Sequence, residues 1–534
     1  MLDAGVMRIN SRQRCRFLVF VLAFSPFLLE MRVDSQESCR GCRATPAASG
    51  RQSPPGDKLL RALIDDADSV SPEFKSDVLL SLVESGKITD LALRKKLINQ
   101  AFSAAEAVQP PYAEAPYGRV GNTAQSRKAV ALSMTQLDRM SLQSRAVHDM
   151  HQLSSLRAKG LFDEMPFPSL GPLDCGDNWL YDPGPFYAAL AEVAKTDFSA
   201  KDISSGERAR FLSPLVGHIS SHAQVVPLAH MMATGGLTDA ELRDVLPIFS
   251  GSLQSIPDDE HTFAVIAEDD GKYVQSVYGT GLIEAMLELV SAAERSGVPP
   301  GPTVSAFRSY LVQNFNQPRC DTDHPPDATT KELLPASVIR FNQTFEVDLR
   351  QTGLAPIASS EIEKAAVMPS RLRDDAPDES YDAKQLTDAL QKLHGSKNQH
   401  TDKNGSVALE WWHELDDFLS HFDAWRQGDE TEADFVREKS DFCMSLIDLI
   451  PPSPQQHKVL SDFISLLEQH SYQHLGGAEW FIYVKLLYMG VYARSSHGDL
   501  LDAFLNSRDP VLRLYARLDR WAGRPIGPHW PAGS

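Results

Sequence analysis

The chain has 534 residues, of which 42% are hydrophobic and 23% charged, as is ordinary for a folded soluble protein. Its formal net charge of −19 argues against a nucleic-acid-binding protein, because neutralising phosphates requires clusters of Lys and Arg. The same charge disfavours docking on anionic lipid. A chain of this length can form two or three hydrophobic cores.

The amino terminus has the features of an export signal. Arginines between Arg8 and Arg16 precede the apolar run FLVFVLAFSPFLL at 17–29. This order predicts a signal peptide over 1–35 and export to the periplasm or the extracellular space. The cleavage site stays open, and an uncleaved anchor or a true start at Met7 are the alternatives. The run is short for a membrane span and no second candidate follows, so we expect no membrane span after cleavage.

Amphipathic helices of ten to twenty residues with short connectors make up most of the remaining chain. The expected order is a flexible leader at 36–56, N-terminal helical hairpins at 57–165, a middle helical domain at 166–320, a loop-rich linker with a short helix at 321–405, a C-terminal helical domain at 406–523 and a tail at 524–534. No strict repeat length is visible. The pattern predicts an all-α protein, with irregular helical hairpins forming an α-solenoid or stacked helical bundles.

The stretch SPEFKSDVLLSLVESGK illustrates this pattern. Ser71 is a suitable N-cap, Pro72 suits the first helical position, and Gly86 suits the end. The apolar positions that share one face are Phe74, Val78, Leu79, Leu82 and Val83. We expect this helix to be a packing unit whose polar face is available to solvent or a partner.

Two segments of the linker are less regular. Residues 338–347 show some strand-like alternation, which is too short by itself to form a sheet. A short helix is expected at 381–394, followed by the polar stretch HGSKNQHTDKNGS, which has no apolar periodicity and reads as a loop.

The cysteines are too few for a disulfide scaffold. Cys175 and Cys320 lie in polar loops at the two ends of the middle domain, and in an oxidising compartment they are candidates for a disulfide bond. The alternative is two unrelated loop cysteines. Cys443 lies in an apolar helical stretch and is expected to be buried.

One loop combines carboxylates with aromatic rings. Asp177, Trp179, Tyr181 and Asp182 lie within CGDNWLYDPGPFY. Such residues can bind a sugar, because a ring stacks on its face while the acids accept hydroxyls or transfer protons. The simpler interpretation, which we favour, is that the aromatic rings fill the boundary between two helical blocks.

Metal and cofactor motifs are incomplete. His148 with His151, and His218 with His222, have spacings that can ligate zinc on a helix, but neither pair has the intervening Glu of a catalytic zinc motif. The acidic segment 321–332 matches parts of a calcium loop but has Pro326 where Gly is needed. We expect no metal and no cofactor.

Several stretches resemble a family of uncharacterised exported all-helical bacterial proteins. They are SPEFKSDVLLSLVESGK, SLQSRAV, LRAKGLFDEM, FLSPLVGHISSHAQVVPLA and SRDPVLRLYARLDR. The resemblance extends over most of the exported chain and consists mainly of helix caps and apolar stripes. It implies a shared helical architecture, and it brings no reaction, ligand or catalytic residue.

These observations predict an exported, non-catalytic helical protein that binds or scaffolds an unknown protein or glycan partner. The alternative is an extracytoplasmic enzyme with an α/α-toroid-like fold that acts on glycans through scattered carboxylates. A closed helical ring with a deep acidic cleft favours the enzyme, and an open or stacked array favours binding.

Overall fold

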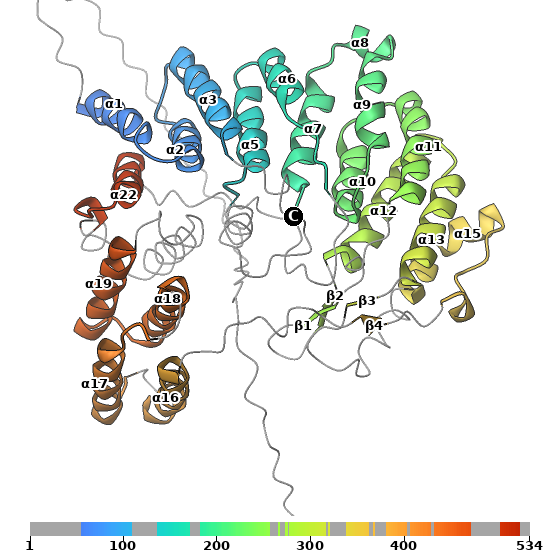
Figure 1. Cartoon of the computed structure of the whole chain (residues 1–534). Coiled ribbons are helices and arrows are strands. Elements are labelled where there is room, and N and C mark those ends of the chain that lie inside the picture. Colours follow the sequence, from blue (N-terminus) through green and yellow to red (C-terminus); the bar gives the residue numbers. More distant parts are fainter. Residues whose placement is uncertain are drawn as a thin grey trace, which may run out of the picture.

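The computed structural model describes residues 55–108, 136–170, 182–256, 265–267, 273–275, 277–316, 319–320, 338–362, 367–368, 381–402, 406–428, 432–470, 502 and 504–523. These residues form helices almost throughout (Figure 1), so the all-α fold class is confirmed. The strands are two short pairs: β1 (Val265–Ala267) runs antiparallel to β2 (Tyr273–Gln275), and β3 (Arg319–Cys320) runs parallel to β4 (Val367–Met368).

The helices of the first two thirds of the chain follow one another along an arc in Figure 1. They are α1 (Pro55–Ala67), α2 (Pro72–Glu84), α3 (Leu91–Glu106), α5 (Arg139–His151), α6 (Ser155–Glu164), α7 (Gly184–Thr196), α8 (Ala200–Ser204), α9 (Glu207–Gly217), η2 (His222–Gln224), α10 (Val225–Thr234), α11 (Asp239–Ser255), α12 (Val277–Arg295), α13 (Gly301–Phe315), α15 (Glu346–Thr352) and η3 (Ser359–Glu361).

The last third contributes five further described helices. They are α16 (Tyr381–His400), α17 (Leu409–Ala424), α18 (Glu432–Leu449), α19 (Pro454–Gln469) and α22 (Pro510–Ala522). In this part α16 packs on α17, and α18 packs on α19. The final helix, α22, returns to the start of the chain and packs on α1 and α2 (Figure 1).

Two rows of helices run through the first two thirds. In one row α2 contacts α5, α5 contacts α7, α7 contacts α10, and α10 contacts α12. In the other row α9 contacts α11, α11 contacts α13, and α13 contacts α15. Short connectors make neighbouring helices contact each other within a hairpin, as α2 with α3 and α5 with α6.

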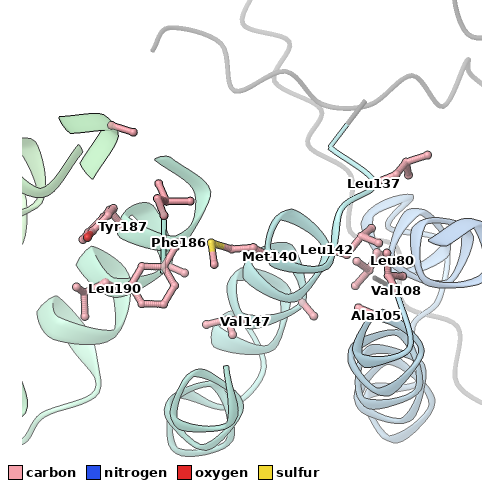
Figure 2. Packing of buried hydrophobic residues seen from close by; sticks show 14 of the residues in the cluster. Leu80, Ala105, Val108, Leu137, Met140, Leu142, Val147, Phe186, Tyr187 and Leu190 are labelled. Carbon is pink, nitrogen blue, oxygen red and sulfur yellow. The ribbon is translucent and has the colours of Figure 1, made fainter. Parts of the chain in front are cut away.

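Helix α5 lies between α2 and α7 in the first row, and its apolar side chains meet neighbours on both sides. Figure 2 shows Leu142 facing the side of Leu80 and Val108, while Met140 points toward Phe186 of α7. These side chains are all buried. Burying a side chain of this size stabilises the fold by about 1.5–3 kcal/mol, so α5 is anchored chiefly by its packing.

The helix α2 confirms the predicted apolar stripe and corrects the expectation for its polar face. The stripe is buried, and Gly86 takes the left-handed backbone conformation, at φ 72°, that ends the helix. Ser71 precedes α2 in extended conformation, but its side chain makes no capping hydrogen bond. Asp77 and Ser81, on the polar face, are buried as well, so α2 is covered on nearly all sides.

Two segments of the expected linker differ from their sequence pattern. Residues 338–344 are helical rather than extended. Helix α16 continues to His400, beyond the expected end at residue 394. Within this extension the Lys397 ammonium donates to the Leu449 carbonyl of α18 at 2.5 Å, a contact with another helix that favours the longer α16. Among the described helices, none is both long enough and apolar enough to cross a membrane.

Candidate functional site

The loop that was a candidate sugar site lies mostly outside the described residues, which exclude Asp177, Trp179 and Tyr181. Its last member, Asp182, is exposed and accepts a hydrogen bond from the Gly184 backbone N–H at 2.7 Å. Asp182 therefore shapes the chain entering α7, since a short carboxylate side chain that accepts a backbone N–H two residues ahead forms a local turn.

The cysteine predictions have separate outcomes. Cys175 lies outside the described residues, so its pairing with Cys320, which lies in β3, stays a prediction. Cys443 is a buried free thiol on α18, as predicted, and burial raises its pKa.

The histidines that share a sequence motif have different partners. His148 contacts the Glu192 carboxylate at 2.9 Å, whereas His151 lies 3.2 Å from the Asp197 carboxylate and 3.2 Å from the Thr196 hydroxyl. The group around His151 has the residue types of a hydrolase triad, but the Thr196 hydroxyl donates to the Glu192 carbonyl at 2.7 Å. A hydroxyl that caps its own helix in this way is not presented as a nucleophile.

The second histidine pair is separated by a helix end. Helix α9 stops at Gly217, and the His218 ring donates to the Pro214 carbonyl at 2.6 Å. His222 lies in η2, where its ring is 2.6 Å from the Tyr310 hydroxyl. The i, i+4 spacing of His218 and His222 therefore does not put the two rings on one helix. Within the part of the chain that is described, no three His, Cys, Asp or Glu side chains are placed to hold a metal ion.

An exposed surface extends along the first row of helices, and we call it the α5–α12 face. Its members are His148 on α5, Ala188 and Glu192 on α7, His230 on α10, and Glu284 and Glu288 on α12, all exposed or partly exposed. Imidazole–carboxylate contacts bridge neighbouring helices of this face: His148 to Glu192, and His230 to Glu288 at 2.8 Å. The face is acidic and contains the titratable imidazoles.

His148 is sensitive to pH because of its position. The hydrogen bond with Glu192 raises the pKa of His148 above its ordinary value. The bridge between α5 and α7 is therefore strongest when the imidazole is protonated, and it weakens as the pH rises through the raised pKa.

Behind this face, a polar cluster lies between α2, α5 and α22. The Arg145 guanidinium binds the Asp77 carboxylate at 2.5 Å and the Glu84 carboxylate through two nitrogens, one of them at 2.6 Å. The Tyr515 hydroxyl of α22 donates to the other oxygen of Asp77. Burial alone lowers the pKa of Arg145, but attraction to Glu84 and Asp77 raises it overall. Burial and the nearby Asp77 raise the pKa of Tyr515.

A further carboxylate adjoins this cluster. Asp149, one turn after Arg145 on α5, is only 4% exposed, and its Oδ2 atom has no hydrogen-bond partner among the described residues. Burial, followed by repulsion from Glu84, raises the pKa of Asp149 to about 7. We call Asp77, Glu84, Arg145, Asp149 and Tyr515 the Arg145 cluster. The cluster has three carboxylates and one guanidinium. Its net charge therefore changes when Asp149 gains or loses its proton.

A fully buried arginine, Arg208, lies between α7, α9 and α11. The Arg208 guanidinium binds Glu241 at 2.8 and 2.5 Å and also donates to the carbonyls of Ala194 and Gly236. Thr238 caps α11 and donates to the same Glu241 carboxylate. Burial alone raises the pKa of Glu241, but the hydrogen bonds from Arg208 and Thr238 lower it overall. This pair is structural, since every partner belongs to the helix framework.

Local sequence reasoning did not identify the Arg145 cluster. A signal is present in the spacing of Asp77, Ser81 and Glu84, which lie on one face of α2. The partners, however, are on α5 and α22, and Tyr515 is 438 positions from Asp77. Comparison with known proteins adds no assignment: no family model, no curated protein and no solved structure matches the chain.

Proposed function

We propose that the protein is an exported binding or scaffold protein that contacts another macromolecule with its α5–α12 face. The observation that carries this proposal is the continuity of the first helix row. Helices α5, α7, α10 and α12 contact one another in succession, and the exposed His148–Glu192 and His230–Glu288 pairs lie across their boundaries. Rows of packed helices offer long surfaces of the kind that repeat proteins use for binding.

The chemistry of the face indicates what a partner has to present. Glu284 pairs with Arg340, and the other glutamates of the face pair with histidines, so each carboxylate is partly neutralised. A protein or glycan that offers hydrogen-bond donors or positive charge to these carboxylates fits both the face and the net charge of −19.

The proposal of export is based on the arginines and the apolar run before residue 30.

Site-specific cross-linking tests the binding proposal. A photoreactive amino acid at Ala188, which is exposed on α7 one turn before Glu192, is expected to cross-link one discrete partner in cells of the organism of origin. Excess unlabelled protein is expected to suppress the product. The control position is Leu156 on α6, which is 84% exposed and lies outside the face. Failure to cross-link at Ala188, or an equal product at Leu156, contradicts the proposal.

Export is tested separately by fusing residues 1–56 to an enzyme that is active only outside the cytoplasm. Activity that depends on the apolar run 17–29 supports export, and a fusion that stays inactive contradicts it. The glycan-cleaving alternative predicts shortened oligosaccharides after incubation with the purified protein, which the binding proposal does not.

A further inference from the structure

The Arg145 cluster connects parts of the chain that are far apart in sequence. Asp77 on α2 is held through one oxygen by Arg145 of α5 and through the other by Tyr515 of α22. The contact between α2 and α22 therefore depends on the Asp77 carboxylate, whose charge Arg145 neutralises. A carboxylate that loses part of this compensation in a buried setting is destabilised.

Asp149 is placed to change that compensation. It lies one turn after Arg145 on the same helix, it is buried, and its Oδ2 atom has no hydrogen-bond partner within the described chain. While Asp149 is neutral, Arg145 binds the carboxylates of Asp77 and Glu84 and also donates to the Ser81 hydroxyl at 2.9 Å. An ionised Asp149 adds a third carboxylate that competes for the same guanidinium and repels Glu84.

We propose that the Arg145 cluster is a proton-controlled latch, in which a neutral Asp149 keeps α22 on the N-terminal hairpin and a charged Asp149 loosens it. This inference concerns regulation of the fold and is independent of the proposed binding function. The pKa of Asp149, raised by burial and by Glu84 to about 7, puts the transition near neutral pH.

Two other charged groups lie near Asp149, and only one of them changes its charge between pH 6 and pH 8. Helix α3 contributes Arg94, whose positive charge favours the ionised form of Asp149 but persists over this pH range. His148, the preceding residue on α5, also favours the ionised form while it is protonated. It loses its charge as the pH rises, so negative charge accumulates further around Arg145.

The other described elements packed on α5 carry charged groups that are bound elsewhere or lie at the surface, and Asp197, whose pKa burial raises, contacts His151 at the far end of α5. On α7, Glu192 is bonded to His148. On α6, Arg157 pairs with Glu164, and Lys159 pairs with Asp163. All four side chains are exposed or partly exposed. On α2, Glu73 is buried near Tyr515 and raises its pKa further, so the tyrosine stays a neutral hydrogen-bond donor.

Other contacts keep α22 nearby when the latch loosens. The rings of Phe74 and Tyr515 meet edge to face at 6.2 Å, and Arg517 pairs with Asp66. The Lys87 ammonium donates to the Trp521 carbonyl at 2.5 Å. The expected change is therefore a more frequent local opening of α22 rather than loss of the helix from the protein.

Hydrogen exchange of the whole chain at pH 6 and pH 8, corrected for intrinsic exchange rates, tests the latch. In the wild type, protection of the amides of α22 is expected to fall about tenfold from pH 6 to pH 8, because linkage gives a change of this size when a pKa near 7 returns to its ordinary value as α22 opens. Amides of α9 and α11, which are joined by the Arg208–Glu241 pair, serve as the internal reference and are expected to keep their protection.

Two variants locate the proton. In Asp149→Asn the protection of α22 is expected to be the same at both pH values, whereas Tyr515→Phe is expected to lower it at both. Unchanged protection of α22 in the wild type overturns the proposal. A wild-type pH dependence that persists in Asp149→Asn also overturns it, and it would assign the proton elsewhere, for instance to Asp509, the N-cap of α22, whose pKa burial also raises. If Asp149→Asn does not fold, the wild type and Tyr515→Phe decide: a tenfold fall in the wild type, together with lower protection of α22 in Tyr515→Phe at both pH values, supports the latch, and protection that Tyr515→Phe leaves unchanged overturns it.

Discussion

Two arginines of the described helices, Arg208 and Arg145, are surrounded differently, and the difference shows how similar ion pairs serve different purposes. Arg208 meets one carboxylate, Glu241, which matches its charge, and it also donates to two backbone carbonyls. Arg145 is shared by Asp77 and Glu84, with Asp149 close by. The first site has no proton to gain or lose near neutral pH, whereas the second has one.

The sites also join different parts of the chain. Arg208 and Glu241 connect helices that are close in sequence, 33 positions apart. The Arg145 cluster connects α2 and α5 to α22, near the other end of the chain. A matched pair within a local unit stabilises that unit permanently, and an unmatched cluster between distant units makes their contact depend on conditions.

The largest expected effect comes from breaking the matched pair. Glu241→Ala leaves the Arg208 guanidinium buried without its counter-charge, since the two side chains are only 2% and 4% exposed. We expect a loss of about 3–5 kcal/mol in the free energy of unfolding, measured by denaturant titration at pH 7. The control is Glu346→Ala, which removes an exposed partner of Arg350 and is expected to cost less than about 1 kcal/mol. Equal losses in the two variants would contradict this comparison.

A smaller effect is expected at the junction with the last helix. Tyr515→Phe removes the hydroxyl that donates to Asp77 and leaves one buried carboxylate oxygen without that donor. The expected loss is about 1–3 kcal/mol by the same titration. Arg517→Ala, on the same helix, breaks the more exposed pair with Asp66 and is expected to cost under about 1 kcal/mol. A larger loss for Arg517→Ala would mean that α22 is held mainly at its surface.

The smallest effect concerns His148. Since its pKa is raised in the folded protein, its bridge to Glu192 stabilises the fold below the ordinary histidine pKa and is lost as the pH rises through the raised value. His148→Gln is therefore expected to lower the melting temperature slightly at pH 5 and to leave it unchanged at pH 8.5. The contribution stays under about 1 kcal/mol, because both side chains are substantially exposed. A loss of equal size at both pH values would indicate packing rather than charge.

The sequence predicted the helical class and many of the buried positions, because apolar residues at helical spacing report directly on which face is covered. The stripe of α2 and the buried Cys443 are examples. It did not predict that the polar positions of α2 are covered as well, because their partners come from α5 and α22. The same limit explains the extension of α16 past Gly395, where the contact of Lys397 with the Leu449 carbonyl of α18 outweighs a weak local preference for helix.

The most direct test of the unmatched cluster is the stability of Asp149→Asn as a function of pH. A carboxyl group whose pKa is raised by folding destabilises the folded state progressively as the pH rises from about 4 to about 7, and an amide does not. We predict that Asp149→Asn is more stable than the wild type by about 2–4 kcal/mol at pH 8 and by less than about 1 kcal/mol at pH 4.5. A variant that is less stable than the wild type at pH 8, or that differs from it equally at both pH values, would contradict this account.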